Sequence, residues 1–424
     1  MKTYHLITFG CQMNKSDSER MRAVFEQIKY SEVDTVEKAD VVVINACSVR
    51  QPAINRIWSF AKSYQKIKKK RELTTILTGC LLDKDRKKFV DLYDFVFNIN
   101  RLDQLKKYLA PDSDVLDKNY FDIRPKHKTS SHAYLPIMTG CNNFCSYCVV
   151  PYVRGREISR SVKSVITEAK ELVKSGCKEI HLLGQNVNSY MPEDNDSYSK
   201  ENPFTHNFAK LLWELNQIKE LPRIHFTSAH PKDMADEVIE SLALPKQVNY
   251  LHLALQSGDN DMLKSMNRKY TVEDYYQIVE KLRKVRPGIA LGTDLIIGFP
   301  GETEEQFQNT LDFYKKVRFD ISFHAMYSER KGTASAEMED DVPYEVKKRR
   351  WNELQEVVKK ITLEDNQRFK DKEVEVLVDQ EGEGWVEGNS SEMKRVRIFN
   401  KDYKIGDLVN VTVDEPQMWI LVSK

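Results

Sequence analysis

The stretch LPIMTGCNNFCSYC, residues 135–148, joins a short apolar strand at 135–139 to three closely spaced cysteines, Cys141, Cys145 and Cys148. From here to residue 326, apolar runs of strand length alternate with helical patterns. Further strands are predicted at residues 179–183, 224–228, 251–255, 291–297 and 321–326. Six such strand–helix units predict an open (β/α)6 barrel, residues 134–366, in a protein of the α/β class.

The residues before the barrel show the same alternation and predict an N-terminal parallel α/β domain, residues 1–110. Short β-branched or apolar runs at 4–9, 41–45 and 75–78 are each followed by a polar helical stretch. That rhythm is typical of parallel strands with crossover helices. Residues 111–133 lose the periodicity and are predicted to be a linker.

The C-terminal part changes character after a long charged helix predicted at residues 343–369. Short alternating strands with glycine-containing turns then predict a small β-barrel, residues 367–424. Within the central domain, residues 189–203 have no periodicity and are predicted to form a mobile loop over the barrel mouth.

The composition bounds the location and the partners of the protein. Its 424 residues are 41% hydrophobic and 30% charged, without an apolar run of membrane-spanning length or a signal-peptide pattern, so we expect a cytoplasmic protein with no membrane partner. Because the net charge is +1, affinity for nucleic acid has to come from local basic patches. Candidate patches are residues 62–71, 84–88, 347–350 and 394–397.

The spacing of Cys141, Cys145 and Cys148 is typical of an iron–sulfur site. Three thiolates leave one iron of a 4Fe–4S cluster without a protein ligand, so a small molecule can chelate that iron. S-adenosylmethionine can do so through its amino and carboxylate groups, and an electron from the cluster then releases methionine and a 5′-deoxyadenosyl radical. Zinc is disfavoured because it normally takes four ligands, and the next histidine downstream is His181.

Cys11, Cys47 and Cys80 each follow a predicted strand of the N-terminal domain. Since the carboxyl ends of parallel strands share one edge, these three thiols are expected to converge. We interpret them as ligands of a second 4Fe–4S cluster, with three unrelated buried cysteines as the alternative. Cys177 lies just before a strand and is interpreted as a small core residue.

Longer motifs make the chain similar, over essentially its whole length, to the radical S-adenosylmethionine methylthiotransferases. They are GCQMNKSDSE at 10–19, NACSVR at 45–50, TGCNNFCSYCVVPYVRGREISR at 139–160, LGQNVNSY at 183–190, SAHP at 228–231, LQSGDNDMLKSMNRKYT at 255–271 and TDLIIGFPGET at 293–303. The sequence GCQMN at 10–14 resembles the MiaB branch, whose members convert isopentenyl-adenosine beside the tRNA anticodon to its 2-methylthio derivative.

The resemblance implies that the two sets of three cysteines hold two 4Fe–4S clusters, with no further catalytic residue assigned. It also implies that one S-adenosylmethionine methylates sulfur on the second cluster. Another yields the radical that abstracts hydrogen from carbon 2 of the adenine, to which the methylthio group transfers. The C-terminal barrel resembles a TRAM module, an RNA-binding fold. Expected partners are the tRNA anticodon stem-loop and an electron donor such as flavodoxin or ferredoxin, and we expect a monomer.

Polar residues at barrel strand ends are candidates for contact with S-adenosylmethionine, because strand ends carry the chemistry of such barrels. These candidates are Gly184, Gln185, Asn186, Ser228, Gln256 and Asp294. Arg154, Arg156 and Arg160 follow the cysteine stretch, and our candidate for pairing with the methionine carboxylate is Arg160. His230 is interpreted as a helix cap, and His181 and His252 as satisfied core residues.

Three alternatives are compatible with the sequence. The first is a sibling methylthiotransferase acting on threonylcarbamoyl-adenosine tRNA or on an aspartate of a ribosomal protein. The second is a non-catalytic iron–sulfur protein that binds RNA or senses redox state, which predicts no turnover of S-adenosylmethionine under dithionite. The third, a zinc-binding RNA module, predicts a colourless protein.

Overall fold

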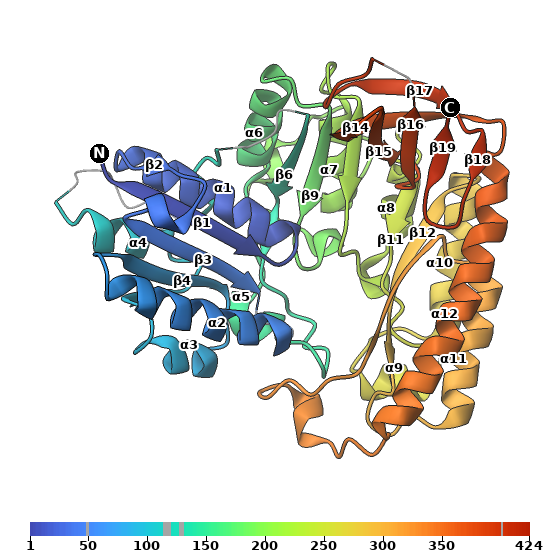
Figure 1. Ribbon diagram of the computed structural model, residues 1–424. Helices are drawn as coiled ribbons and strands as arrows, with labels where there is room; N and C mark the ends of the chain where they lie inside the picture. Colours follow the sequence, from blue (N-terminus) through green and yellow to red (C-terminus); the bar gives the residue numbers. More distant parts are fainter. Residues whose placement is uncertain (48–50, 113–119, 127–130, 400–401) are drawn as a thin grey trace. The chain divides into compact units, whose positions relative to one another are not determined.

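The computed structural model describes residues 1–47, 51–112, 120–126, 131–399 and 402–424 (Figure 1). The last three residues of the NACSVR motif, and residues 113–119 and 127–130 of the predicted linker, lie outside the described residues. The chain forms two compact units. The first contains Met1–Lys128 with Thr139–Asn142 and Cys148–Arg160, and the second contains Thr129–Met138, Asn143–Tyr147 and Ser161–Lys424.

Five parallel strands form the sheet of the first unit, in the order β2-β1-β3-β4-β5. They are Thr3–Phe9 (β1), Ser31–Glu32 (β2), Val41–Cys47 (β3), Thr74–Cys80 (β4) and Phe95–Val96 (β5). Every residue of β3 from Val41 to Ala46 is buried, as expected for a central strand covered on both faces. The predicted parallel α/β domain is confirmed.

Helices cover both faces of this sheet (Figure 1). They are Gln12–Gln27 (α1), Gln51–Lys68 (α2), Asp83–Phe89 (α3) and Leu102–Leu109 (α4). Helices α1 and α4 pack with Leu6 and Val43, whereas α2 and α3 pack with Val42 and Ile44, because successive strand residues point to opposite faces. Within the predicted linker, the 3-10 turn Tyr120–Asp122 packs Tyr120 against α1 and α4.

Six parallel strands in chain order form the barrel of the second unit, which confirms the predicted (β/α)6 arrangement. They are His132–Pro136 (β6), Glu179–Leu183 (β9), Arg223–Phe226 (β10), Tyr250–His252 (β11), Ala290–Ile297 (β12) and Ile321–Met326 (β13). A bridge between Ala229 and Leu253 joins the sheet β6-β9-β10 to the sheet β11-β12-β13. The short strands Met138–Thr139 (β7) and Ile158–Ser159 (β8) flank the cysteine stretch on either side.

The barrel helices pack their apolar sides against these strands. They are Val162–Lys174 (α6), Asn207–Asn216 (α7), Asp236–Ser241 (α8), Asn260–Ser265 (α9), Val272–Val285 (α10), Glu304–Val317 (α11) and Tyr344–Asn366 (α12). Capping boxes start α10 at Thr271 and α11 at Thr303. Loop 189–203 is anchored where Asp194 accepts the N–H of Val162, 2.7 Å, at the start of α6. No helix in the described part of the chain is both long and apolar enough to cross a membrane.

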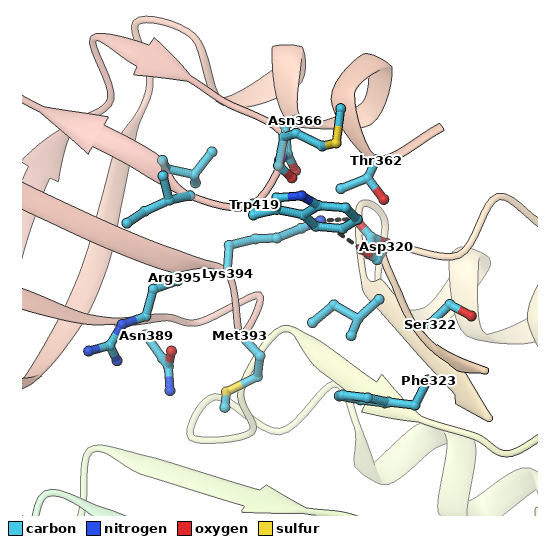
Figure 2. Close-up of a pocket in the computed structure, with 14 residues that line it drawn as sticks. Asp320, Ser322, Phe323, Thr362, Asn366, Asn389, Met393, Lys394, Arg395 and Trp419 are labelled. Carbon is cyan, nitrogen blue, oxygen red and sulfur yellow. Dashed lines mark hydrogen bonds and ion pairs between the residues drawn. The ribbon is translucent and has the colours of Figure 1, made fainter. Parts of the chain in front are cut away.

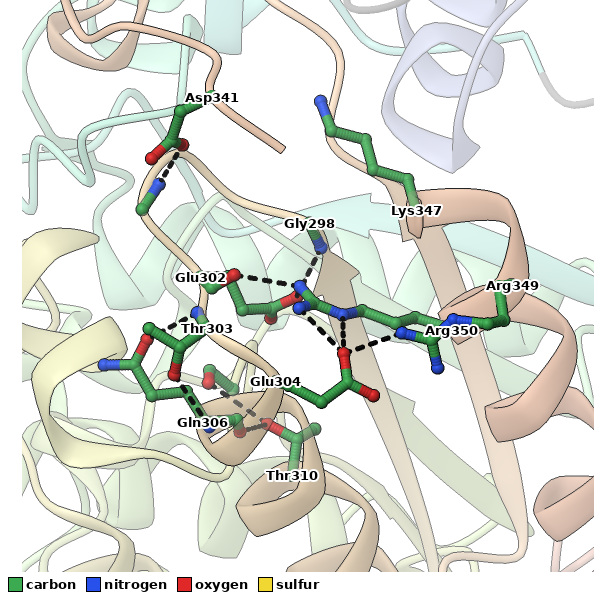
Figure 3. Close-up of polar contacts among 12 residues, drawn as sticks. Gly298, Glu302, Thr303, Glu304, Gln306, Thr310, Asp341, Lys347, Arg349 and Arg350 are labelled. Carbon is green, nitrogen blue, oxygen red and sulfur yellow. Dashed lines mark hydrogen bonds and ion pairs between the residues drawn. The ribbon is translucent and has the colours of Figure 1, made fainter. Parts of the chain in front are cut away.

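A buried ion pair fastens α12 to the loop after β12 (Figure 3). Arg350 Nη1 donates to Glu302 Oε2, 2.9 Å, and the same oxygen accepts the N–H of Gly298, 2.8 Å. Burial raises the pKa of Glu302 to about 7, against the opposing effect of Arg350. Lys347 is buried too and pairs with Asp340. The interpretation of Lys347 and Arg350 as a basic surface patch is therefore wrong, because acidic partners bring both side chains inside.

Replacing Arg350 by methionine is expected to lower the free energy of unfolding by about 1–3 kcal/mol, because the buried Glu302 carboxyl would lose the hydrogen bond that Arg350 donates. The matched control is Arg349→Met, since Arg349 is half-exposed and makes only surface ion pairs, worth about 0–1 kcal/mol. Urea unfolding followed by circular dichroism measures both changes. Equal effects of the two substitutions would contradict the assignment.

The C-terminal part is a curled, mixed six-stranded sheet in the order β17-β14-β15-β16-β19-β18, which corresponds to the predicted small β-module. Its strands are Glu373–Gly382 (β14), Trp385–Ser390 (β15), Arg395–Phe399 (β16), Leu408–Thr412 (β17), Glu415–Pro416 (β18) and Leu421–Ser423 (β19). Lys394 is buried and its Nζ lies 3.4 Å from Asp320 Oδ1, which corrects its place in the basic patch 394–397. Arg395 and Arg397 both pair with Glu387.

Candidate functional site

Three cysteines lie at one edge of the first sheet. Cys47 and Cys80 end β3 and β4 and are register partners, and Cys11 is the N-cap of α1, directly after β1. Asn14 lies between them, because its Oδ1 is 3.5 Å from Cys11 Sγ and its Nδ2 is 3.9 Å from Cys80 Sγ. The structure thus brings together the three thiols that the strand ends predicted.

Glycines make room for this arrangement. Gly79, just before Cys80, has φ +119°, and a Cβ there would lie 2.0 Å from the carbonyl oxygen of Ala46. At Gly10, just before Cys11, a Cβ would lie 2.9 Å from the Cβ of Cys47. Side chains at either position would push the cysteine-bearing segments apart.

A buried cation lies against Cys80. Arg154, the last residue of helix Val150–Arg154 (α5), donates from Nε to Cys80 Sγ, 3.1 Å, and from Nη2 to Asp17 Oδ2, 2.6 Å. The Arg154 and Asp17 side chains are 1% and 0% exposed. The hydroxyl of Tyr120 donates to the other oxygen of Asp17, 2.5 Å. Arg154 is therefore held in place by the first unit alone.

Burial dominates the electrostatics of Cys80 and disfavours its thiolate in the metal-free protein. Burial raises the pKa of the Cys80 thiol to about 12, and the charge of Arg154 acts in the opposite direction. Soft thiolates beside a fixed cation fit the ligand set of an iron–sulfur cluster.

The second set of cysteines is held close together by the chain itself, since Cys141, Cys145 and Cys148 lie within eight residues. The N–H of Cys141 donates to the carbonyl of Gly155, 3.1 Å, and Cys145 Sγ accepts from Arg268 Nη1, 3.3 Å. These contacts hold Cys141 and Cys145 through different parts of the chain. The spacing leaves a 4Fe–4S cluster with one open iron, which suits a chelating small molecule.

Asn267 and Arg268 are site residues that the sequence reasoning missed. Asn267 Nδ2 donates to the carbonyl of Phe144, 2.8 Å, and Arg268 Nη2 donates to that of Ala254, 2.9 Å, while Nη1 reaches Cys145. Both residues belong to the motif at 255–271, which was quoted without a role for them. The charge of Arg268 within that motif was the available signal, but its partner Cys145 lies 123 residues away in the sequence.

Most of the predicted S-adenosylmethionine contacts lie at the carboxyl ends of consecutive barrel strands. Ser228 and Gln256 have φ values of +66° and +73°, which are uncommon for side-chain-bearing residues and tend to cluster at functional sites. The N–H of Gln256 donates to the carbonyl of Asp294, 2.8 Å, so the ends of β11 and β12 are tied together. Asp294 Oδ2 lies 2.8 Å from His252 Nε2, and Asn186 donates to Asp233.

Other predicted residues have local structural roles. A Cβ at Gly184 would lie 2.5 Å from Met138 Cγ, so close packing alone requires glycine there, and Gln185 follows it at the end of β9. Arg160 belongs to the first unit, where its guanidinium lies over Phe121, 5.6 Å from the ring centre. His230 Nδ1 accepts the N–H of Lys232, 3.2 Å, which confirms the predicted cap. Burial lowers the pKa of His230 to about 2, so this imidazole is neutral.

A Glu–His–His group lies near the amino ends of β9 and β10. Ligand atoms of Glu179, His181 and His225 all lie within 4.8 Å of one another. Arg223 Nε, however, lies 2.8 Å from Glu179 Oε2 and supplies the positive charge that this buried carboxylate requires. Arg223 also donates to the carbonyl of Ser390, 2.9 Å. We therefore assign the group to packing between the barrel and the C-terminal sheet.

Comparisons with known proteins agree with this geometry. The radical SAM superfamily matches residues 135–314, and the Uncharacterized protein family UPF0004 matches residues 3–98. Among solved structures, the radical S-adenosylmethionine methyltransferase TsrM from Kitasatospora setae has a TM-score of 0.58 at 14% identity, covering 79% of this chain and 74% of that one. OxsB, a cobalamin-dependent S-adenosylmethionine radical enzyme, has a TM-score of 0.55 at 12% identity, covering 84% of this chain and 56% of that one. These likenesses concern the fold alone.

The barrel, its cysteine stretch and these matches define a radical SAM enzyme, which uses a 4Fe–4S cluster and S-adenosylmethionine. The tRNA-2-methylthio-N(6)-dimethylallyladenosine synthase of Acetivibrio thermocellus is 40% identical over 445 residues, covering 99% of this chain and 90% of the relative. The synthase of the same name from Clostridium novyi is 39% identical, with 100% and 96% covered. The chain belongs to this family, the MiaB-type radical SAM methylthiotransferases.

Proposed function

We propose that the enzyme inserts a methylthio group at carbon 2 of N6-dimethylallyl-adenosine, the isopentenyl-adenosine beside the anticodon of tRNA. The observation that carries this proposal is the similarity to synthases of that name over the full length of both chains. It is supported by the two separate sets of three cysteines, because the reaction needs both a radical source and a place to hold sulfur.

Cys141, Cys145 and Cys148 would hold the cluster that cleaves S-adenosylmethionine, and Cys11, Cys47 and Cys80 a second 4Fe–4S cluster. When bound, the first cluster would supply the electron that cleaves S-adenosylmethionine, and the second would supply an iron that can bind sulfur. Arg268 would orient Cys145, and Arg154 would hold a positive charge at Cys80.

Further roles are proposed for residues at the barrel strand ends, which would bind S-adenosylmethionine, and for the C-terminal sheet, which would bind RNA. The predicted contacts of S-adenosylmethionine stay Gly184, Gln185, Asn186, Ser228, Gln256, Asp294 and Arg160. The C-terminal sheet would contribute to binding the anticodon stem-loop, in line with its resemblance to a TRAM module. A flavodoxin or ferredoxin would deliver electrons to a monomeric enzyme.

The substrate is tested by incubating the anaerobically reconstituted enzyme with S-adenosylmethionine, dithionite and either dimethylallylated or threonylcarbamoylated tRNA. Nucleoside mass spectrometry is expected to find the 2-methylthio product only with the first tRNA. Product only with the second would assign the chain to the sibling activity. Absence of any S-adenosylmethionine cleavage would favour the non-catalytic alternative.

Iron and sulfide analysis tests the two-cluster proposal. Reconstituted protein is expected to approach about eight irons and eight sulfides per chain, since each 4Fe–4S cluster supplies four of each. A plateau near four would eliminate the second cluster, and a colourless zinc-loaded protein would eliminate both.

A further inference from the structure

A small cavity lies between the barrel and the C-terminal sheet (Figure 2). Its volume is about 280 Å³, near the lower end of the range for small-molecule sites. Strand β13 and helix α12 form one side, and β15, β16 and the turn before β19 form the other. All these elements belong to the second unit. The cavity can take one flat ring system of the size of a nucleobase.

Two large aromatic side chains at this cavity are left in solvent. Trp419 is 58% exposed and Phe323 is 59% exposed. The backbone of the turn that carries Trp419 is fixed by α12, because Asn366 Nδ2 donates to the carbonyls of Gln417, 2.8 Å, and Met418, 3.1 Å. An exposed ring on a fixed backbone is the feature that single-stranded nucleic-acid binding proteins use to stack bases.

Two buried polar atoms of residues in the cavity wall have no hydrogen-bond partner among the described residues. Thr362 Oγ1 and Asn366 Oδ1 come from residues that are 3% and 2% exposed and lie one turn apart on α12. Because the Asn366 amide nitrogen is already committed to Gln417 and Met418, its oxygen must face a donor. Buried orphan atoms are costly, so they indicate a ligand with a donor and an acceptor side by side. An exocyclic amino group next to a ring nitrogen, as in adenine or cytosine, has this pattern.

The surrounding charge suits a nucleotide. The carboxylate of Asp320 faces two cations, since Arg368 Nη2 is 2.8 Å and Lys394 Nζ is 3.4 Å from its Oδ1. Phe323 in turn contacts His252, with ring centres 5.9 Å apart, and His252 contacts Asp294 at the predicted S-adenosylmethionine site. Phe323 and His252 thus link the cavity wall to Asp294, one of the predicted S-adenosylmethionine contacts.

We propose that this cavity binds one unstacked, amino-bearing base of the RNA substrate, a neighbour of the reacting adenosine. The base stacks on Trp419 and Phe323, while Asn366 Oδ1 accepts from its amino group and Thr362 donates to its ring nitrogen. This inference rests on the proposed function, because it assumes that RNA is the substrate.

The test uses the full-length reconstituted enzyme and an anticodon stem-loop RNA that carries dimethylallyl-adenosine. Trp419→Ala is expected to weaken binding about tenfold or more at fixed salt, as loss of one base stack does, and Phe323→Ala less. Tyr344→Ala is the matched control, since Tyr344 is an aromatic residue that is 61% exposed, like Trp419, but lies at the start of α12 and does not line the cavity. Thermal unfolding checks that Trp419→Ala is folded, and fluorescence anisotropy measures affinity.

A scan of loop positions with abasic residues identifies the bound base. One abasic position is expected to weaken binding to the wild type but to have no further effect on Trp419→Ala. If Trp419→Ala and Phe323→Ala both bind every RNA like the wild type, the cavity is not a base site. If Trp419→Ala weakens all abasic RNAs equally, the ring contacts the backbone and the base proposal is wrong. A wild type that neither binds nor modifies the RNA would overturn the proposed function itself.

Discussion

Replacing Cys11, Cys47 and Cys80 together by alanine will abolish formation of the methylthio nucleoside and will leave formation of 5′-deoxyadenosine in place. The two cysteine sets come from different segments, one from three strand ends of the first sheet and one from a single stretch of eight residues. Each set can therefore be removed without deleting a ligand of the other. Parallel measurement of 5′-deoxyadenosine and modified nucleoside checks the expectation.

The reciprocal variant removes the other set. Replacing Cys141, Cys145 and Cys148 is expected to abolish both products, because the radical comes from the site with the open iron. Cys177→Ala is the matched control for loss of a buried thiol, since Cys177 is 3% exposed and its Sγ donates to the Glu179 carbonyl, 3.2 Å, away from both cysteine sets. It should keep both activities.

Two outcomes would contradict this division. A folded Cys11/Cys47/Cys80 variant that still makes the methylthio product would show that these cysteines do not hold the sulfur site. A folded variant that loses 5′-deoxyadenosine as well would show that the two sites depend on each other. Circular dichroism and the iron content, expected near four, establish that the variant is folded and loaded.

Replacing Arg154 by methionine is expected to destabilise the first unit by about 3–5 kcal/mol, because Asp17 would be left as an uncompensated buried charge. It is also expected to lower the reduction potential of a cluster ligated by Cys80, since a cation 3.1 Å from the sulfur favours the reduced, more negative form. Urea unfolding of the metal-free protein measures the first effect. An EPR-monitored redox titration of the reconstituted protein measures the second.

A double variant separates the two effects. Arg154→Met with Asp17→Asn removes both charges while keeping an acceptor for the Tyr120 hydroxyl, so most of the lost stability should return. The reduction potential should stay low, because the cation is still missing. Arg156→Met, at an exposed position of the same segment, serves as the control. A normal potential in the double variant would mean that Arg154 acts through folding alone.

Much of the fold followed from local patterns. Strands β9 and β13 have the bounds that periodicity predicted, because a strand shows its buried face in the spacing of a few neighbouring residues. The end of β6 was less accurate: the predicted strand 135–139 is split between β6 and β7. Pro136 ends β6, and a proline lacks the N–H that a continuous ladder needs.

Charged residues were the ones that sequence patterns misplaced. Lys347, Arg350 and Lys394 read as parts of basic patches, yet all three are buried against carboxylates. Whether a cation lies in solvent or inside depends on a partner, and the partner of Lys394 is 74 residues away. Local composition carries no information about that partner.

The sequence by itself determined the family and predicted the two cysteine sets, because cluster spacing and strand-end position are properties of short segments. Only the tertiary structure decided which cations contact those cysteines. Arg154 donates to Cys80, which is 74 residues away in the sequence, and Arg268 donates to Cys145, which is 123 residues away. The tertiary structure alone also joined Thr362, Asn366 and Trp419 into one cavity. The physical reason is that hydrophobic periodicity acts over a few residues, whereas a buried charge or orphan polar atom is satisfied by whatever the packed chain brings beside it.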